Sequence, residues 1–220
     1  MKVCTDSCLF GAWIANKIEQ KIINPKTVLD IGTGTGLLSL MLAQKTNAQI
    51  DAVDIDKKSA EQASENFNKS PWSKFLHAFH SDIKEWDPLH KYDLIISNPP
   101  FYENDLLPKK EGKLISKHSD AMRLEDLLSV VKNLLAEDGS FTVLIPWHRT
   151  KWFETAASLS SFFIKEKTEV RQTPAHSYFR TMLILQNKKT NSLTNELAIK
   201  NNNEYTSEFS ELLRDYYLYL

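Results

Sequence analysis

The sequence has little of several features that define common classes of protein. It holds only two cysteines, Cys4 and Cys8, with no second pair or close histidine to complete a metal set, so we expect buried free thiols. No apolar run approaches the roughly 18 residues of a membrane-spanning helix. The N-terminal stretch MKVCTDSCLFGAW lacks the shape of a secretory signal. These absences predict a cytoplasmic protein with no membrane anchor and no metal.

The chain also lacks an excess of charge of either sign. Its 27 lysines and arginines nearly balance 28 acidic residues, for a formal net charge of −1, which argues against a general affinity for nucleic acid. A length of 220 residues suits one well-filled domain. We therefore predict a single domain over residues 1–220, as a monomer, in which any nucleic acid must be met by a local basic patch.

Predicted strands and helices alternate along most of the chain. The strands are Thr27 to Ile31, QIDAVDID ending near Asp54, FLHAFHSD ending at Asp82, KYDLIIS and SFTVLIP. The helices are Ser7 to Gln20, a helix from Leu37, KKSAEQASENF, RLEDLLSVVKNLL closed by Asp138-Gly139, and WHRTKWFETAASLSSF. This alternation predicts right-handed βαβ units and an α/β fold with a doubly wound, mostly parallel sheet.

The last third of the chain departs from that alternation. FIKEKTEVRQ and YFRTMLILQ, separated by TPAHS, are too close together for a helical crossover, so they predict an antiparallel hairpin at one edge of a seven-stranded sheet. The polar stretch NKKTNSLTNE predicts a loop, and YTSEFSELLRDYYLYL predicts a closing helix.

A glycine-rich turn, DIGTGTG, follows the first predicted strand. Ligands of such sheets bind at the carboxyl ends of the strands, and Gly32, Gly34 and Gly36 let the backbone come close to one. The third glycine arrives one residue too early for G-x-G-x-x-G, and Leu37 stands where that motif has glycine. The spacing therefore makes a dinucleotide less favoured.

Two carboxylates end the next two predicted strands on the same side of the sheet. Asp54 stands at a distance suited to accepting hydrogen bonds from two ribose hydroxyls, and Asp82 can accept from an adenine amino group. Three independent features on one rim favour an adenosine-containing cofactor.

The fourth predicted strand runs into SNPPF. Each proline lacks an N–H and has a fixed φ, so the strand must stop at Ser97 or Asn98. The Asn98 side-chain oxygen and the Pro99 carbonyl can both accept hydrogen bonds from one NH₂ group, Pro100 helps to fix them, and Phe101 offers a flat surface for stacking. This arrangement suits methyl transfer to a planar amino nitrogen, which needs orientation more than a general base.

DIGTGTG, Asp54 and NPPF resemble the class I methyltransferases that depend on S-adenosylmethionine, a Rossmann-like fold. More narrowly, MKVCTDSCLFGAW, LIISNPPFY, NSPW and the ending LLRDYYLYL resemble the valine-tRNA adenine-N6-methyltransferase family, which methylates the adenosine immediately 3′ of the anticodon.

The resemblance assigns residues to both partners. Asn98 and Phe101 would hold the target adenine, within the catalytic turn Asn98, Pro99, Pro100 and Phe101. The N-terminal helical segment, 1–24, would pack near the cofactor. Contacts to S-adenosylmethionine would come from Thr5, Asp6, Asp30, Gly32, Thr33, Gly34, Gly36, Leu37, Asp54, Ile55, Asp82, Ile83 and Asn98.

Basic residues follow the catalytic turn and offer a place for tRNA. A predicted substrate loop, 101–122, carries several lysines, and PWHRTKW adds two further cations between tryptophans on the same rim. The predicted RNA-binding residues are Lys109, Lys110, Lys113, Lys117, Arg149, Lys151 and Arg180, with Arg171 and His176 nearby.

Several other functions remain open from the sequence. NPPF suits a carboxamide equally well, which leaves a protein glutamine N5-methyltransferase as the alternative enzyme. A DNA adenine methyltransferase is less favoured because no separate base-reading domain is evident. A nucleotide-binding module without catalysis and a dinucleotide oxidoreductase also remain, and cofactor binding would distinguish them.

Overall fold

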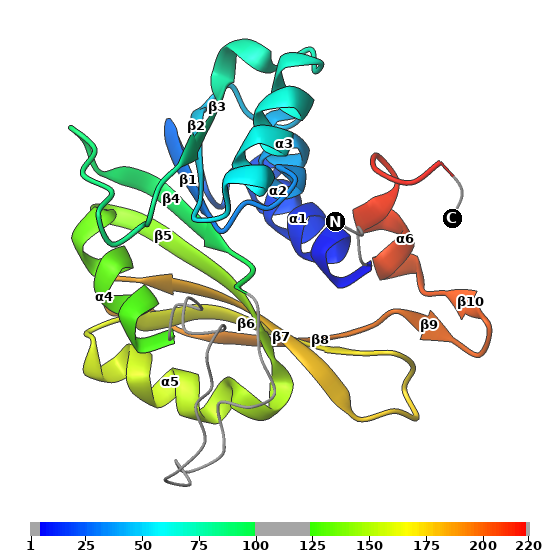
Figure 1. Cartoon of the computed structure of the whole chain (residues 1–220). Coiled ribbons are helices and arrows are strands. Elements are labelled where there is room, and N and C mark those ends of the chain that lie inside the picture. Colours follow the sequence, from blue (N-terminus) through cyan, green and yellow to red (C-terminus); the bar gives the residue numbers. More distant parts are fainter. Residues whose placement is uncertain (1–4, 100–123, 219–220) are drawn as a thin grey trace, which may run out of the picture.

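The computed structural model describes residues 5–99 and 124–218. Eight strands form one sheet in the order β3-β2-β1-β4-β5-β7-β6-β8 (Figure 1). Their bounds are β1 Thr27–Ile31, β2 Gln49–Asp54, β3 Leu76–His80, β4 Tyr92–Ser97, β5 Leu135–Pro146, β6 Phe163–Arg171, β7 Tyr178–Gln186 and β8 Leu193–Ala198. A separate small hairpin joins β9, Lys200–Asn201, to β10, Glu204–Tyr205.

Helices cover both faces of the sheet. The α-helices are α1 Thr5–Glu19, α2 Leu37–Ala43, α3 Lys57–Asn68, α4 Leu124–Leu134, α5 Thr150–Leu159 and α6 Ser207–Leu213, and 3₁₀ turns span Ser73–Phe75 and Trp147–Arg149. Side chains of α1, α2, α3 and α6 share one hydrophobic cluster with the sheet, and those of α4 and α5 share a second on the other face (Figure 1). The predicted doubly wound α/β fold is confirmed.

Parallel pairing places the carboxyl ends of β1, β2, β3, β4 and β5 along one rim of the sheet. Because β7 runs antiparallel to β5, it is the start of β7 that reaches this rim, where Arg180 pairs with Pro146. The end of β6 lies there too, since Arg171 pairs with Ala198 at the end of β8. This edge of the sheet, called the functional rim, includes Asp54 and the strand ends that precede the glycine turn and Asn98.

The predicted hairpin of β6 and β7 is confirmed, but it does not form the edge of the sheet, and the expected count of seven strands was wrong. Most of an eighth strand, β8, lies in the predicted loop NKKTNSLTNE. This strand pairs with β6 in parallel and forms the edge of the sheet. Only Leu197 of β8 is buried, so this polar edge strand carries no alternating hydrophobic signal.

Three other boundaries differ from the sequence prediction. The helix α4 ends at Leu134, and β5 begins at once, with a register shift that places Asp138 and Gly139 inside the strand. The acidic residues there form ion pairs with Lys188 just past β7, which accounts for a polar stretch inside a strand. The third strand ends at His80, because Asp82 begins a turn by accepting a hydrogen bond from the Lys84 N–H at 2.9 Å.

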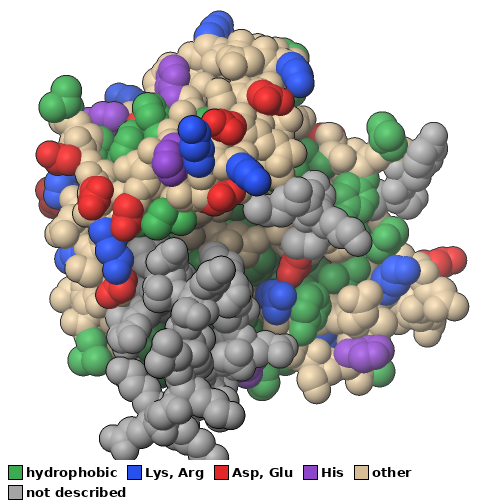
Figure 2. Space-filling view, in the orientation of Figure 1, with side chains coloured by type: hydrophobic (Ala, Val, Ile, Leu, Met, Phe, Trp, Pro, Cys, Tyr) green, Lys and Arg blue, Asp and Glu red, His purple; other side chains and the backbone are tan. Residues whose placement is uncertain are grey.

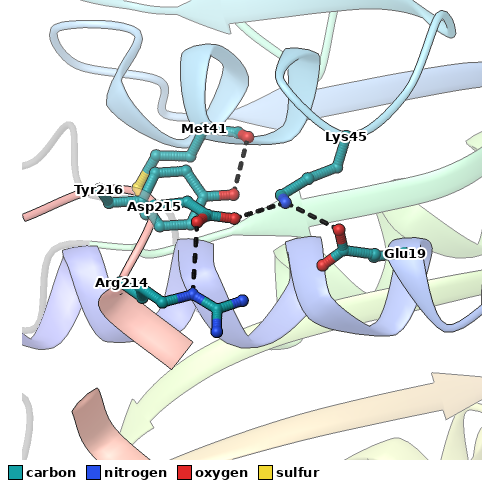
Figure 3. A network of polar contacts seen from close by, with 6 residues as sticks. All are labelled: Glu19, Met41, Lys45, Arg214, Asp215 and Tyr216. Carbon is teal, nitrogen blue, oxygen red and sulfur yellow. Dashed lines mark hydrogen bonds and ion pairs between the residues drawn. The ribbon is translucent and has the colours of Figure 1, made fainter. Parts of the chain in front are cut away.

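The closing helix is shorter than predicted. It spans Ser207–Leu213, where the Thr206 hydroxyl caps its start by accepting from the Phe209 N–H. Polar contacts then tie the following residues to α1 and α2 (Figure 3). Lys45 Nζ lies 2.6 Å from Asp215 Oδ2 and 2.9 Å from Glu19 Oε1, and Tyr216 donates to the Met41 carbonyl. Hydrogen bonding to Asp215, and then to Glu19, raises the pKa of Lys45.

No helix within residues 5–99 and 124–218 is long and apolar enough to span a bilayer. Cys8 is buried, while Cys4 lies outside the described residues.

Candidate active site

The turn between β1 and α2 has a backbone that glycine alone adopts readily. Gly32, Gly34 and Gly36 have φ angles of +72°, +60° and +79°, in the left-handed region. The turn is held against β2 because the Gly32 N–H donates to the Val53 carbonyl at 2.8 Å. The sequence pattern therefore corresponds to a loop on the functional rim that is fixed in a conformation favouring glycine.

Gly32 and Gly36 differ in what surrounds them. A Cβ at Gly36 would lie 2.4 Å from Cε1 of Phe67, so this glycine lets α3 pack against the turn. A Cβ at Gly32 would meet no described atom within 4 Å. The backbone at Gly32 thus faces open space, which suits the close approach of a ligand.

Asp30 is a buried carboxylate beneath this turn. Its Oδ2 accepts hydrogen bonds from Thr33 and Ser39, each at 2.7 Å, while its Oδ1 is buried without a hydrogen-bond partner among the described residues. Burial raises the pKa of Asp30 to about 6, although the bonds from Ser39 and Thr33 oppose this. A carboxylate with one unused oxygen fits the cationic amino group of a methionine moiety.

Asp54 ends β2 and braces the glycine turn. Its Oδ2 accepts from the Gly34 N–H at 2.8 Å and its Oδ1 accepts from the Asp56 N–H at 2.9 Å. An ionised carboxylate can accept about four hydrogen bonds, so each oxygen keeps capacity for one more. The predicted ribose contact is compatible with this geometry.

The region expected to hold the adenine follows β2 and β3. Ile55 is exposed and Ile83 is buried, so Ile55 offers apolar surface next to Asp54. The Asp82 Oδ1 accepts from the Lys84 N–H, which fixes the carboxylate within its turn. Both predicted adenine contacts stay predictions.

Asn98 stands at the end of β4 and is oriented by a residue far away in the sequence. Its Nδ2 donates to the Ser7 hydroxyl at 2.8 Å, a bond from β4 to α1. Because this contact uses the NH₂ side of the amide, the Oδ1 is the atom left to accept from a substrate. Pro99 is buried, and Ser97 is held by a bond to the Ile31 carbonyl. Pro100 and Phe101 lie outside the described residues.

The start of α1 links this asparagine to β7. Asp6 accepts from the Ser7 N–H with Oδ1 and from Arg180 Nε with Oδ2, at 3.0 and 2.9 Å. Ser7 was not among the predicted site residues, and nothing in the local sequence distinguishes it from an ordinary helix-start serine. Only the tertiary contact reveals its position.

The predicted RNA-binding residues are only partly described. Lys109, Lys110, Lys113 and Lys117 lie outside the described residues, as does the whole of 101–122. Lys151 is exposed and Arg149 half-buried at the end of β5, beside two exposed tryptophans, Trp147 and Trp152. Basic and acidic side chains are intermixed on the face shown in Figure 2. Arg180 is neutralised by Asp6, so its charge is already used within the protein.

No group of three His, Cys, Asp or Glu side chains among the described residues is arranged to hold a metal ion. The carboxylates of the rim serve instead as hydrogen-bond acceptors.

Comparisons with known proteins agree with this geometry. Residues 12–163 match the Methyltransferase small domain family. The structure resembles that of a "predicted O-methyltransferase" from Agrobacterium tumefaciens with a TM-score of 0.70, at 15% identity, over 94% of this chain and 95% of the other. Fold and site together define a class I methyltransferase, the class that uses S-adenosylmethionine.

Relatives with similar sequences identify the family within this class of methyltransferases. The tRNA1(Val) (adenine(37)-N6)-methyltransferase of Flavobacterium psychrophilum is 40% identical, with 99% of this chain and 93% of the relative aligned. The protein of that name from Photorhabdus laumondii is 35% identical over 100% of this chain and 89% of the relative. The chain belongs to the family of tRNA1(Val) (adenine(37)-N6)-methyltransferases.

Proposed function

We propose that this protein methylates N6 of adenine 37 in tRNA1(Val), the adenosine immediately 3′ of the anticodon, as the names of its relatives state for them. The observation that carries the proposal is the orientation of Asn98 at the functional rim. Its Nδ2 is engaged by Ser7, so its Oδ1 is presented to a substrate amino group.

The chemistry follows from the two acceptors. The N6 hydrogens donate to Asn98 Oδ1 and to the Pro99 carbonyl, which fixes the plane of the base and turns the nitrogen lone pair toward the methyl group. S-adenosylmethionine would supply that methyl group from its sulfonium sulfur. Transfer would form the N6–methyl bond and break the methyl–sulfur bond, with S-adenosylhomocysteine as the leaving group and the N6 proton released to solvent. Phe101 stacks on the adenine.

The cofactor is held by the three carboxylates in separate roles. Asp30 faces its amino group, Asp54 takes its ribose hydroxyls and Asp82 its adenine. The orphaned Oδ1 of Asp30 and the open space at Gly32 support the first assignment, and the remaining acceptor capacity of Asp54 supports the second. The other contacts proposed are Thr5, Asp6, Thr33, Gly34, Gly36, Leu37, Ile55 and Ile83.

The RNA is held by a basic rim around this pocket. Lys151 and Arg149, together with the lysines of 101–122, are the proposed phosphate contacts. We infer that the chain acts as a single domain and as a monomer, and a tRNA substrate favours the cytoplasm as its location.

The test is transfer of labelled methyl from S-adenosylmethionine to unmodified tRNA1(Val), beside a transcript with guanosine in place of adenosine 37. Label in the first transcript alone is expected. Label in neither, with the cofactor bound, would contradict the tRNA assignment and direct the assay to a protein glutamine, whose carboxamide the NPPF turn also fits.

A further inference from the structure

A cavity of about 350 Å³ lies on the rim toward the β6 and β8 end of the sheet. It is lined from the start of α1 by Thr5 and Asp6, from the β6–β7 loop by Gln172, from β7 by Phe179, and from the β9–β10 hairpin by Lys200 and Tyr205. None of the glycine turn, Asp54 or Asp82 lines it, so it extends away from that part of the proposed cofactor pocket, and only Thr5 and Asp6 are common to both.

Two residues of α1, Asp6 and Ser7, connect the cavity to Asn98. Asp6 lines it, and the next residue, Ser7, accepts the hydrogen bond from Asn98. Arg180, which adjoins Phe179 in β7, holds Asp6 in place. A molecule in this cavity therefore contacts the element that orients Asn98.

The aromatic lining is fixed in position. Tyr205 stacks on Phe209 with ring centroids 4.9 Å apart, and Phe209 is fully buried. Phe179 is half-buried beside the guanidinium of Arg180, 5.6 Å from the ring centroid. Hydrophobic and basic side chains lie together on this part of the surface, beside β9 and β10 (Figure 2). Rigid rings of this kind suit the stacking of an unpaired base.

Lys200 supplies a positive charge at this cavity. Its Nζ lies 4.9 Å from the centroid of the Tyr205 ring, and no carboxylate of the described residues forms an ion pair with it. Arg180 and Arg171, the nearby cations, are paired with Asp6 and Glu196. Lys200 is thus the cation of this cavity best suited to a phosphate.

We propose that the cavity holds a second nucleotide of the anticodon loop, adjacent in sequence to the target adenosine; this rests on the proposed function. Its base stacks on Phe179 and meets the exposed Gln172 amide at its edge, while its phosphate pairs with Lys200. Turning the target adenine into the catalytic pocket removes a stacking partner from its neighbour, and Phe179 replaces that partner.

The test uses steady-state kinetics with a tRNA1(Val) anticodon stem-loop and two further stem-loops, each abasic on one side of the target adenosine. Phe179→Leu keeps apolar volume but removes the ring, and we expect it to raise KM for the RNA about tenfold. Lys200→Ala should raise KM roughly threefold to tenfold and lower the salt slope of binding by about 0.7. In both variants kcat and the affinity for S-adenosylmethionine should stay within about twofold of the wild type.

The controls separate the cavity from general charge and from folding. Lys57→Ala on α3 removes an exposed lysine remote from the cavity and should leave KM unchanged. With wild-type protein, one of the two abasic stem-loops should have a KM about tenfold higher than that of the intact stem-loop. Phe179→Leu should not raise the KM of that abasic stem-loop further. If Lys200→Ala matches Lys57→Ala, or both abasic stem-loops behave as the intact one, the cavity proposal is overturned while the function stands. A wild-type protein that methylates no tRNA overturns both.

Discussion

Replacing Gly32 or Gly36 by alanine should separate a ligand-facing glycine from a packing glycine. Both residues have a left-handed φ, so each alanine costs about 1–2 kcal/mol of unfolding free energy. At Gly36 the new Cβ also lies 2.4 Å from Phe67 Cε1 and 3.3 Å from Ala63 Cβ, and relieving that overlap costs about 1–3 kcal/mol more. At Gly32 the Cβ meets no described atom.

The expected totals are about 1–2 kcal/mol for Gly32→Ala and about 2–5 kcal/mol for Gly36→Ala. With roughly 2–4 °C per kcal/mol in a chain of this size, Tm should fall by about 2–8 °C in the first variant and about 4–20 °C in the second. Affinity for S-adenosylmethionine should change in the opposite order. Gly32→Ala should lose roughly 5- to 100-fold, because its Cβ enters the ligand space, and Gly36→Ala should lose little.

Differential scanning calorimetry and titration calorimetry measure the two quantities. A Phe67→Leu background is the matched control, because it removes the two ring atoms nearest the new Cβ. In that background Gly36→Ala should lower the free energy of unfolding only by the cost of the left-handed backbone. Equal loss of cofactor affinity in both glycine variants, or a lower Tm for Gly32→Ala than for Gly36→Ala, would refute the reasoning.

Three further predictions concern single side chains. Asn98→Ala should keep its affinity for S-adenosylmethionine but lose at least about 100-fold in kcat, since its acceptor serves the substrate; an equal loss of both would contradict the role assigned. The raised pKa of Asp30, about 6 against 3.8, means that the folded state binds more protons between those values. Unfolding free energy should therefore fall by up to about 3 kcal/mol as pH rises from 4 to 6, and urea titrations of Asp30→Asn should lack that fall. Lys17 and Glu166 form a partly buried ion pair at 2.7 Å between α1 and β6. Lys17→Met should cost about 1–3 kcal/mol, because Glu166 loses its cation and keeps only the hydrogen bond from Asn195, and Glu166→Leu in the same chain should restore most of that loss; urea unfolding that shows no such recovery would contradict the pairing.

The alternating part of the fold could be predicted from sequence because each element carries its own local signal. Thr27 to Ile31 is a short, mostly apolar run before glycines, and the helix beginning at Lys57 has Asp56 as its N-cap. The strand β8 has no such signal, because its pairing with β6 uses backbone groups while most of its side chains face solvent. Nor does the sequence give the correct start of β5, since Asp138-Gly139 has the composition of a turn but lies inside the strand, at the register shift between the pairs Tyr92–Leu135 and Leu94–Ser140.

The residues of the candidate site also differ in whether the sequence could predict them. Glycines and strand-end carboxylates were visible because their residue types follow from the backbone conformation and the ligand. Ser7 and the lining of the second cavity were not, since their proximity to Asn98 depends on how α1, β7 and β9 meet in space. The RNA contact predicted for Arg180 stays a prediction, and the structure adds its ion pair with Asp6, which no local pattern in the sequence indicates.

The bond between Ser7 and Asn98, together with that between Asp6 and Arg180, has a consequence during synthesis. Asn98 is held by α1, and α1 is held in turn by β7, a strand that leaves the ribosome more than 80 residues after Asn98. A nascent chain that already contains the glycine turn and all of β4 still lacks β7, whose contact with Asp6 holds the helix that orients the Asn98 amide. Methyl transfer should therefore require a complete β7, so chains that end before this strand should bind S-adenosylmethionine but transfer little methyl.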